Sequence, residues 1–420
     1  LIVKESPLSH EVGVHERCGT PVELILRDQY FVKVLDIKKE IIALADKINW
    51  FPKYMKTRFI NWVENLKWDW CISRERYYGI PIPSEDNLVF DTWFTSGNTP
   101  EISTLKGGKI PYSLRPQAHD IIRTWAFYTL VMAYYKNQGI PWENAAISGH
   151  LLLRQGEKIS KKTGGGSMRP EDQIALHSAD AIRWSVSGAS LGVDGYYEEK
   201  EIEMGKKIVN KLFNASNFVI NAIKDLQPGE ITSPLDIYMV EKSKTIADQM
   251  SKYFSQFDYS HSRDLIQNFF WNDFCDYYLE IIKKPIYEND QRKQSVQNAL
   301  KIILKNILIM FTPFIPHITE SIYQSFFQDQ KSINFESWPK KDSVLENEQT
   351  ITQLFEIISL VRGKKTTSGF TLSSPINKLI IKHPILTKNE LEKFEYDLKA
   401  VTRAQEISLE KSDLALIDFA

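Results

Sequence analysis

Residues 145–166 read AAISGHLLLRQGEKISKKTGGG, and the rest of the chain is organised around this stretch. Its first half is an apolar run of strand length that ends at the turn-forming pair Gln155-Gly156. Its second half packs three lysines into five residues before three glycines: Lys158, Lys161 and Lys162. A strand that leads into such a loop can place ammonium groups over a polyphosphate, and a solvated surface loop is the alternative. The spacing excludes a Walker A loop, since no glycine directly precedes a Lys-Ser or Lys-Thr pair.

The composition narrows the class of protein. The 420 residues leave room for two or three domains, and the formal net charge of -1 argues against a surface devoted wholly to nucleic acid. Three scattered cysteines are too few for a disulfide framework, which fits a reducing cytosol. We find neither a signal peptide nor an apolar run of bilayer-spanning length. We therefore expect a cytoplasmic protein with no membrane partner.

One short motif has the spacing of metal ligands. His15-x-x-Cys18 has the spacing of half a zinc knuckle, but no second Cys or His pair lies nearby to complete a tetrahedral site. We expect no metal bound by protein side chains.

The middle of the chain alternates strands and helices, which predicts a parallel sheet with crossover helices. Residues 1–27 look strand-like. The expected elements after them are a helical stretch over 28–69 that stops at Phe51-Pro52 and resumes over 54–66, a helix over 121–135, a strand over 146–153 and a helix over 171–187. His119 and Asp120 precede the second of these helices, where backbone N–H groups point at anions or ribose hydroxyls. An Asp at that place is otherwise an ordinary N-cap.

After about residue 200 the pattern changes to long amphipathic helices. An apolar stripe from Ile208 to Leu226 marks the first expected helix, and Ser233-Pro234-x-Asp236 begins the second. Three further helices are expected over 261–284, 291–310 and 318–327. From about 346 a smaller α+β piece follows, with a helix over 350–361, a strand over 378–382 and a helix opened by the capping box Thr387-x-x-Glu390. The predicted fold class is α/β followed by all-α.

Several stretches, in the same order, resemble the class I aminoacyl-tRNA synthetases and specifically the valyl enzymes. Lys158-Ile159-Ser160-Lys161 looks like the family's second ATP signature, and 70–83 looks like the re-entry into the nucleotide-binding fold after the editing domain. Residues 91–94 and 119–128 resemble active-site walls. Residues 271–280 and 313–320 resemble the anticodon-binding domain. The resemblance implies a Rossmann-like half-fold over 28–200, an editing-domain remnant over 1–27, a helical anticodon-binding domain over 201–345 and a small α+β piece over 346–420.

The resemblance also implies a chemistry and a set of site residues. The family joins valine to ATP as an adenylate, with Mg2+, and then transfers the acyl group to tRNA. The implied roles are these: catalysis by Lys158 and Lys161; ATP binding by His119, Asp120, Lys158, Ser160 and Lys161; the amino-acid pocket from Asp91, Trp93 and Trp125; tRNA contacts from Arg74, Arg76 and Trp271. Core packing is the alternative for Trp125, and we expect Trp271 and Trp338 to be mainly structural.

The sequence departs from the family pattern in four ways. It has no His-x-Gly-His signature, it has almost none of the editing domain, and seven residues separate Pro83 from Asp91 where many relatives carry a longer segment. It also has Lys162 where the family has Ser and Ala118 where the family has Gly. Two hypotheses follow. The chain is the carboxyl-terminal part of a valine enzyme that needs an amino-terminal half, or it is a non-catalytic paralogue that binds tRNA.

Overall fold

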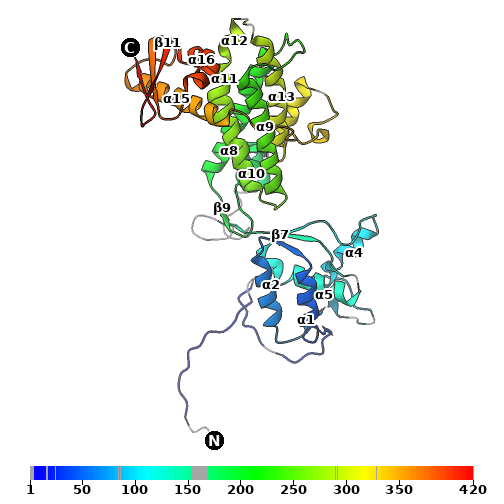
Figure 1. The fold of residues 1–420 in the computed structure, drawn as a ribbon. Coiled ribbons are helices and arrows are strands. Elements are labelled where there is room, and N and C mark those ends of the chain that lie inside the picture. Colours follow the sequence, from blue (N-terminus) through cyan, green and yellow to red (C-terminus); the bar gives the residue numbers. More distant parts are fainter. Residues whose placement is uncertain are drawn as a thin grey trace. The chain divides into compact units, whose positions relative to one another are not determined.

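The computed structural model describes residues 4–15, 18–23, 25–83, 85, 87–137, 139–152, 169–288, 290, 292–327 and 329–419. The chain folds into two compact units, Leu1–Ala145 and Ala146–Ala420. Figure 1 shows their helices and strands. Each unit is described by itself.

The first unit combines short strands with a buried helix. Its elements are β1 (Phe31–Val32), α1 (Lys38–Asp46), β2 (Asn49–Phe51), α2 (Met55–Glu64), β3 (Trp70–Cys71), β4 (Ser73–Arg74), β5 (Val89–Phe90), α3 (Thr92–Ser96), α4 (Thr99–Thr104), β6 (Arg115–Ala118), the 3-10 turn η1 (His119–Ile122), α5 (Trp125–Tyr135) and β7 (Asn144–Ser148). A three-stranded sheet has the order β2-β7-β6, and β1–β3 and β4–β5 are antiparallel pairs. Helix α5 is apolar on nearly every side, so eight of its eleven residues are buried.

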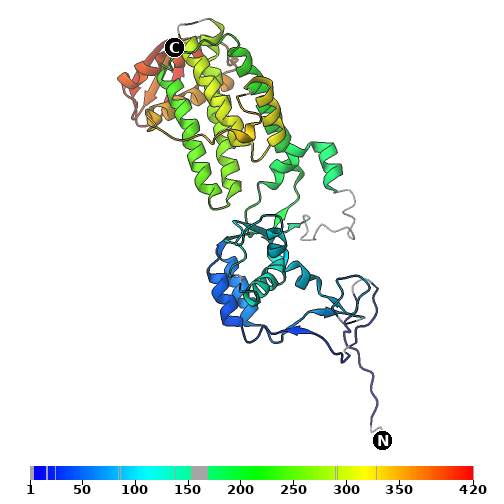
Figure 2. The same ribbon diagram turned by 90° about the vertical axis from the view of Figure 1, so that its right-hand side faces the viewer.

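Three sequence expectations for this unit were wrong in detail. The two helical parts expected on either side of Phe51-Pro52 are present as α1 and α2, but the first begins only at Lys38 and the strand β2 between them was not predicted. The described residues of 4–27 form one isolated bridge, Val14 to Pro21, around a turn in which Gly19 N–H donates to His15 O at 2.8 Å, and no longer strand (Figure 2). The helix expected from Ile121 begins at Trp125, because residues 119–122 form a tighter 3-10 turn.

In the second unit, the strand expected over 146–153 is broken after β7. It resumes as β8 (Leu151–Leu152), which pairs in parallel with β9 (Gly195–Tyr196). The break lies at Gly149, where an added Cβ would sit 2.0 Å from the carbonyl oxygen of Val193. Two backbone hydrogen bonds flank this approach: Gly192 N–H to Ile147 O at 2.7 Å and Gly195 N–H to His150 O at 2.8 Å. Only a residue without a side chain fits between these strands.

The helix expected over 171–187 is two helices, α6 (Pro170–His177) and α7 (Ala179–Val186). They are separated at Ser178, whose positive φ of 78° ends the first helix, while its hydroxyl caps the second. Asp180 is buried at the start of α7. Its carboxylate accepts hydrogen bonds from the backbone N–H groups of His317 and Ile318 at 3.2 and 2.8 Å. A carboxylate at the amino end of α14 (Pro316–Phe326) compensates the dipole of that helix and ties α7 to the bundle.

The remaining helices of this unit form a bundle around a large apolar core (Figures 1 and 2). They are α8 (Glu199–Ala222), α9 (Pro234–Phe254), α10 (Tyr259–Asn268), the π-helix η3 (Phe269–Tyr278), α11 (Leu279–Ile281), α12 (Lys283–Tyr287) and α13 (Lys293–Phe311). The single helix expected over 261–284 is therefore interrupted by a ten-residue π-helical stretch. Among the described residues, no helix is both long and apolar enough to cross a membrane.

A small α+β layer ends the second unit. It contains α15 (Glu348–Thr367), β10 (Ile376–His383), α16 (Lys388–Thr402), β11 (Ala404–Lys411) and β12 (Leu416–Phe419), preceded by a 3-10 turn, η4 (Ile333–Phe335). Strand β10 is central, parallel to β11 and antiparallel to β12. The capping box predicted at Thr387 and Glu390 is confirmed. Helix α15 extends past the predicted Val361, and β11 and β12 were not predicted.

A buried ion network links this layer to the bundle. Arg292 donates to Asp236 at 2.7 Å and also pairs with Asp397 on α16. The hydroxyls of Tyr278 and Ser295 donate to Asp236 at 3.0 and 2.7 Å. The sequence placed Asp236 in the first turn of α9 and gave no sign of its burial. Its side chain is completely buried, and these groups donate hydrogen bonds to its carboxylate.

Asp273, on the π-helix, is a carboxylate that lacks such donors. No described group donates a hydrogen bond to its carboxylate, and the nearby Lys242 is already paired with Glu348 at 2.7 Å. Burial raises the pKa of Asp273 from its ordinary 3.8 to about 6. An ionised Asp273 therefore destabilises the fold at neutral pH.

We predict that Asp273→Asn raises the free energy of unfolding at pH 7.5 by roughly 1–3 kcal/mol and has little effect near pH 4.5. The folded pKa lies above the unfolded value, so the folded protein binds a proton that the unfolded chain releases between about pH 4 and 6. Stability due to this group falls as pH rises through that window. Urea unfolding across pH tests this, with Asp276→Asn as the control because Asp276 pairs with Lys211 at 3.0 Å. Equal effects of the two variants would contradict the assignment.

We also predict that Gly149→Ala lowers the free energy of unfolding of the second unit by roughly 1–3 kcal/mol, because the new methyl group forces β8 and β9 apart. The matched change is Gly363→Ala in α15, where nothing lies within 4 Å and the helix gains up to about 1 kcal/mol. Denaturant midpoints at constant m measure both effects. A Gly149→Ala midpoint equal to that of the unsubstituted chain would rule out the close approach.

Candidate functional site

Asp91 is the buried carboxylate of the first unit, only 4% exposed. It follows β5 and precedes α3, and its backbone N–H bonds to Ile72 O at 2.7 Å. The indole N–H of Trp70 donates to one carboxylate oxygen at 3.2 Å, and the Arg74 guanidinium lies 3.5 Å from the other. Both partners come from the preceding strands β3 and β4. Trp93, predicted beside Asp91 in the same pocket, is half-buried on α3.

Arg74 is held inside this cluster. Its guanidinium also donates to the carbonyl oxygens of Cys71 and Ser73 at 3.0 and 2.7 Å. Arg76, two residues later, is exposed. The structure thus places the two arginines predicted to contact tRNA in different settings, and only Arg76 has an exposed side chain.

Tyr128 ends the stretch 119–128 that resembles an active-site wall, but no role of its own was predicted for it. Its ring stacks on Trp70, with 3.9 Å between centroids and an interplanar angle of 15°. Burial, with the nearby Asp91 charge, raises the pKa of the Tyr128 hydroxyl, so it stays protonated and able to donate. No spacing signal distinguishes this position from its apolar neighbours on α5.

Trp125 opens α5 and is 8% exposed. The Arg115 guanidinium lies 3.3 Å from the centroid of its ring, and Trp142 stacks on it at 5.2 Å. Burial lowers the pKa of Arg115. In this structure Trp125 is packed between elements of the first unit, and its role in an amino-acid pocket stays a prediction.

His119 and Asp120 lie together on η1, directly after β6, and both are half-buried. They begin a four-residue 3-10 turn and not the α-helix that was expected. The aligned N–H groups of a long helix therefore do not begin at this pair. Lys158, Ser160 and Lys161 lie outside the described residues, so the lysine loop stays a prediction from sequence.

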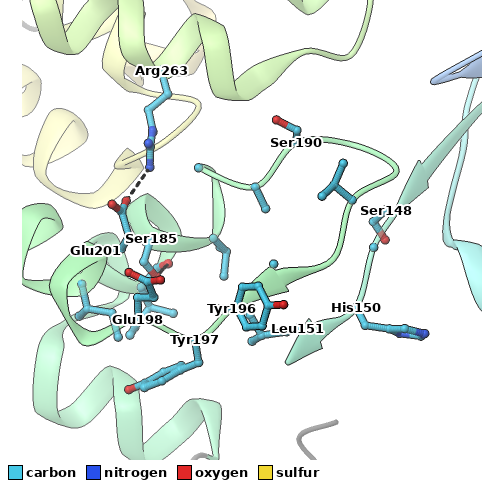
Figure 3. A pocket seen from close by; sticks show the side chains of 18 of the residues that line it. Ser148, His150, Leu151, Ser185, Ser190, Tyr196, Tyr197, Glu198, Glu201 and Arg263 are labelled. Atoms are coloured by element: carbon cyan, nitrogen blue, oxygen red, sulfur yellow. Dashed lines mark hydrogen bonds and ion pairs between the residues drawn. The ribbon is translucent and has the colours of Figure 1, made fainter. Parts of the chain in front are cut away.

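The strand that leads into this loop lines a cavity of about 960 Å³ in the second unit (Figure 3). Ser148 and His150 lie on one side, and Tyr196 and Tyr197 come from β9 and the residue after it. On another wall Arg263 pairs with Glu201 at 3.3 Å. Hydroxyl groups on a mostly apolar lining suit a ligand with an apolar ring and a few polar groups.

Trp271 is half-buried on the π-helix, and the Lys211 ammonium lies 3.8 Å from its ring centroid. Trp338 donates its indole N–H to Ala247 O at 3.0 Å and meets Phe254 edge-on. Both rings pack against the bundle core. These contacts suit the structural role expected for both tryptophans.

Two family models match the chain. The model described as tRNA synthetases class I (I, L, M and V) matches residues 22–85 and 84–197. The model described as the anticodon-binding domain of tRNA ligase matches residues 236–381.

Curated relatives match along nearly the whole chain. The valine--tRNA ligase of Ehrlichia ruminantium (strain Welgevonden) is 34% identical over 98% of this chain and 56% of its own length. The valine--tRNA ligase of Wolbachia pipientis wMel is 33% identical over 100% of this chain and 55% of its own length. The chain thus spans about half the length of the curated relatives it matches.

Solved structures support the fold. The Mycobacterium tuberculosis methionyl-tRNA synthetase bound by methionyl-adenylate has a TM-score of 0.63 and 16% identity over 80% of this chain and 72% of that one. Taken with the two family models and the relatives, this places the chain among the class I aminoacyl-tRNA synthetases.

Proposed function

We propose that this chain is the carboxyl-terminal part of a valine–tRNA ligase. The observation that carries the proposal is the identity of 32–35% to valine--tRNA ligases over 96–100% of the chain. A carboxylate oxygen of valine attacks the α-phosphorus of ATP, and the bond to the bridging oxygen breaks with release of pyrophosphate. A terminal ribose hydroxyl of tRNA then attacks the acyl carbon, loses its proton and displaces AMP.

The residue roles are part of the proposal. Lys158 and Lys161 stabilise charge that develops on the departing pyrophosphate, and Ser160 contacts the same phosphates. His119 and Asp120 bind the adenosine portion. This assignment suits two half-buried polar groups that follow a sheet strand, where ligands bind in open α/β folds.

Asp91 is assigned a positioning role within the amino-acid pocket. Its carboxylate holds Trp70 and Arg74, and Tyr128 packs on Trp70, so these side chains form a preset wall. Trp93 and Trp125 supply the apolar surface for the valine side chain. A pocket of this kind separates valine from isoleucine by size and rejects threonine poorly.

ATP enters the proposal as its magnesium complex. Of the residues that the structure describes, no group of three or more His, Cys, Asp or Glu side chains is placed to hold a metal. The proposed Mg2+ is therefore assigned to the phosphates of ATP. It would neutralise part of their charge, while the lysines act on the leaving group.

The partners in this proposal are tRNA and a segment bearing the first ATP signature, which these 420 residues do not contain. Arg74, Arg76 and Trp271 are the proposed tRNA contacts, and of the two arginines only Arg76 has an exposed side chain. The alternative, a paralogue that binds tRNA without activating an amino acid, is not favoured by the relatives.

We predict valine-dependent exchange of pyrophosphate into ATP by the protein that carries this chain. Lys158→Ala should lower the rate by roughly 100- to 1,000-fold, because it removes a positive charge that stabilises the pyrophosphate as it leaves in the transition state. Lys162→Ala is the matched control and should retain activity within about threefold, since the family has an uncharged Ser at that position.

Isoleucine and threonine serve as substrate controls in the same assay. Exchange that is equal with all three amino acids, or equal in Lys158→Ala and the unsubstituted protein, would overturn the proposed function. Absence of exchange with retained tRNA binding would favour the non-catalytic paralogue.

A further inference from the structure

Three charged side chains meet inside the contact between the bundle and the α+β layer. The Arg292 guanidinium pairs both with Asp236 on α9 and with Asp397 on α16. The side chains of the two carboxylates are 0% and 5% exposed, and that of Arg292 is 12% exposed. With both carboxylates ionised, the three groups carry one net negative charge in the protein interior. A single guanidinium can neutralise only one carboxylate, so the network has a negative charge in excess.

The two carboxylates differ in the number of groups that donate to them. Asp236 accepts hydrogen bonds from the Arg292 guanidinium and from the hydroxyls of Tyr278 and Ser295, at 2.7, 3.0 and 2.7 Å. Asp397 accepts from the Arg292 guanidinium, and no other group in the described part of the chain donates to it. Each donor favours the ionised form of a carboxyl group. The negative charge is therefore better stabilised on Asp236, and a proton binds at least cost on Asp397.

The charges around Asp397 agree with this placement. Burial raises the pKa of Asp397 to about 6, although Arg292 acts in the opposite direction, and the charge of Asp236 adds to the effect of burial. Asp290, close to Arg292 in the chain, has donors of its own. It accepts hydrogen bonds from the Arg292 backbone N–H and from the Tyr396 hydroxyl, at 2.9 and 2.8 Å.

The remaining charged groups on the elements that pack against α16 do not neutralise Asp397. Each has partners of its own or is exposed: Glu280 with Lys283, Lys284 beside the Tyr396 ring, Arg362 beside the Tyr277 ring, Lys364 with Asp418, Lys365 with three backbone carbonyls, and the exposed Glu406, Glu410 and Lys411 of β11. A proton on Asp397 is thus the available way to remove the excess charge.

We propose that this network is a pH-sensitive latch, in which a proton bound by Asp397 fastens the α+β layer to the bundle. With the proton bound, Arg292 and Asp236 form a neutral pair and no buried charge is left over. When the proton leaves, one negative charge stays buried at the contact. Separating α16 from the bundle exposes that charge to water, so the layer is held less firmly once Asp397 is ionised.

The direction of the pH dependence follows from the raised pKa of Asp397. The docked layer binds a proton that the undocked layer releases between about pH 4 and pH 6. Docking is therefore firmest at acidic pH, and it weakens as the pH rises through this window. Above about pH 6 Asp397 is ionised in both states, and docking changes little further.

The test is hydrogen–deuterium exchange of the backbone amides of α16 at about pH 5 and pH 7.5, corrected for the intrinsic exchange rate at each pH. The full chain carries Asp273→Asn throughout, because Asp273 titrates in the same range. Opening of α16 should be roughly 10-fold more frequent at the higher pH. Asp397→Asn leaves the network neutral at both pH values, so the two corrected rates should agree within about twofold.

The matched control is Glu392→Gln, which removes an exposed carboxylate of the same helix and should keep the ratio of roughly 10. Asp236→Asn is a second network variant. It also leaves Arg292 with one carboxylate and should also remove the difference, which keeps the test decisive if Asp397→Asn does not fold.

Equal corrected rates at the two pH values in the chain with an intact network would overturn the latch. A ratio of roughly 10 that persists in folded Asp397→Asn, or that disappears in Glu392→Gln, would overturn it as well. The measurement needs no substrate, so its outcome is independent of the proposed ligase activity.

Discussion

The pairing of Arg292 with Asp236 and Asp397 is the constraint on which the second unit depends. Two buried carboxylates come from α9 and α16, and one guanidinium between them donates to both. Removing Arg292 would leave two buried carboxylates without a cation, which is far more costly than losing a surface ion pair. The network therefore fixes the α+β layer against the bundle.

Lys365 shows how a buried charge can be compensated differently. Carboxylates cancel the charge of Arg292, whereas three backbone carbonyls satisfy the protons of Lys365 but leave its net charge in place. Hydrogen-bond satisfaction and charge neutralisation are thus separate requirements. Arg292 has both hydrogen-bond acceptors and opposite charges as partners. Lys365 has only hydrogen-bond acceptors, so its buried ammonium keeps an uncompensated positive charge.

The fold class predicted from the sequence, α/β followed by all-α, is confirmed. Long amphipathic helices and the capping box at Thr387 follow from local patterns, so sequence alone predicts them well. The breaks at Gly149 and Ser178 cannot be predicted from local patterns. The first depends on the close approach of Val193 and the second on one positive φ. Strand β11 is half-exposed and mostly polar, and β12 has only four residues, so neither shows a clear strand pattern in the sequence. The π-helix over 269–278 has no sequence signature at all.

In the candidate site, too, the sequence predicted which residue types are present but not the environment of each. Sequence resemblance identified Asp91 and Arg74 but could not show that they neutralise each other, nor that Arg76 alone of the two arginines is exposed. The net charge of the chain, likewise, does not show how charged residues are distributed in the fold. The cavity lined by Lys283, Lys284, Arg362, Lys365, Arg403 and Glu280 carries a formal excess of four positive charges, so the rest of the chain carries a formal excess of five negative charges to reach the total of -1. Interactions between exposed charges are screened beyond about 8 Å in physiological salt, so the local excess and not the total charge decides which ions such a cavity attracts.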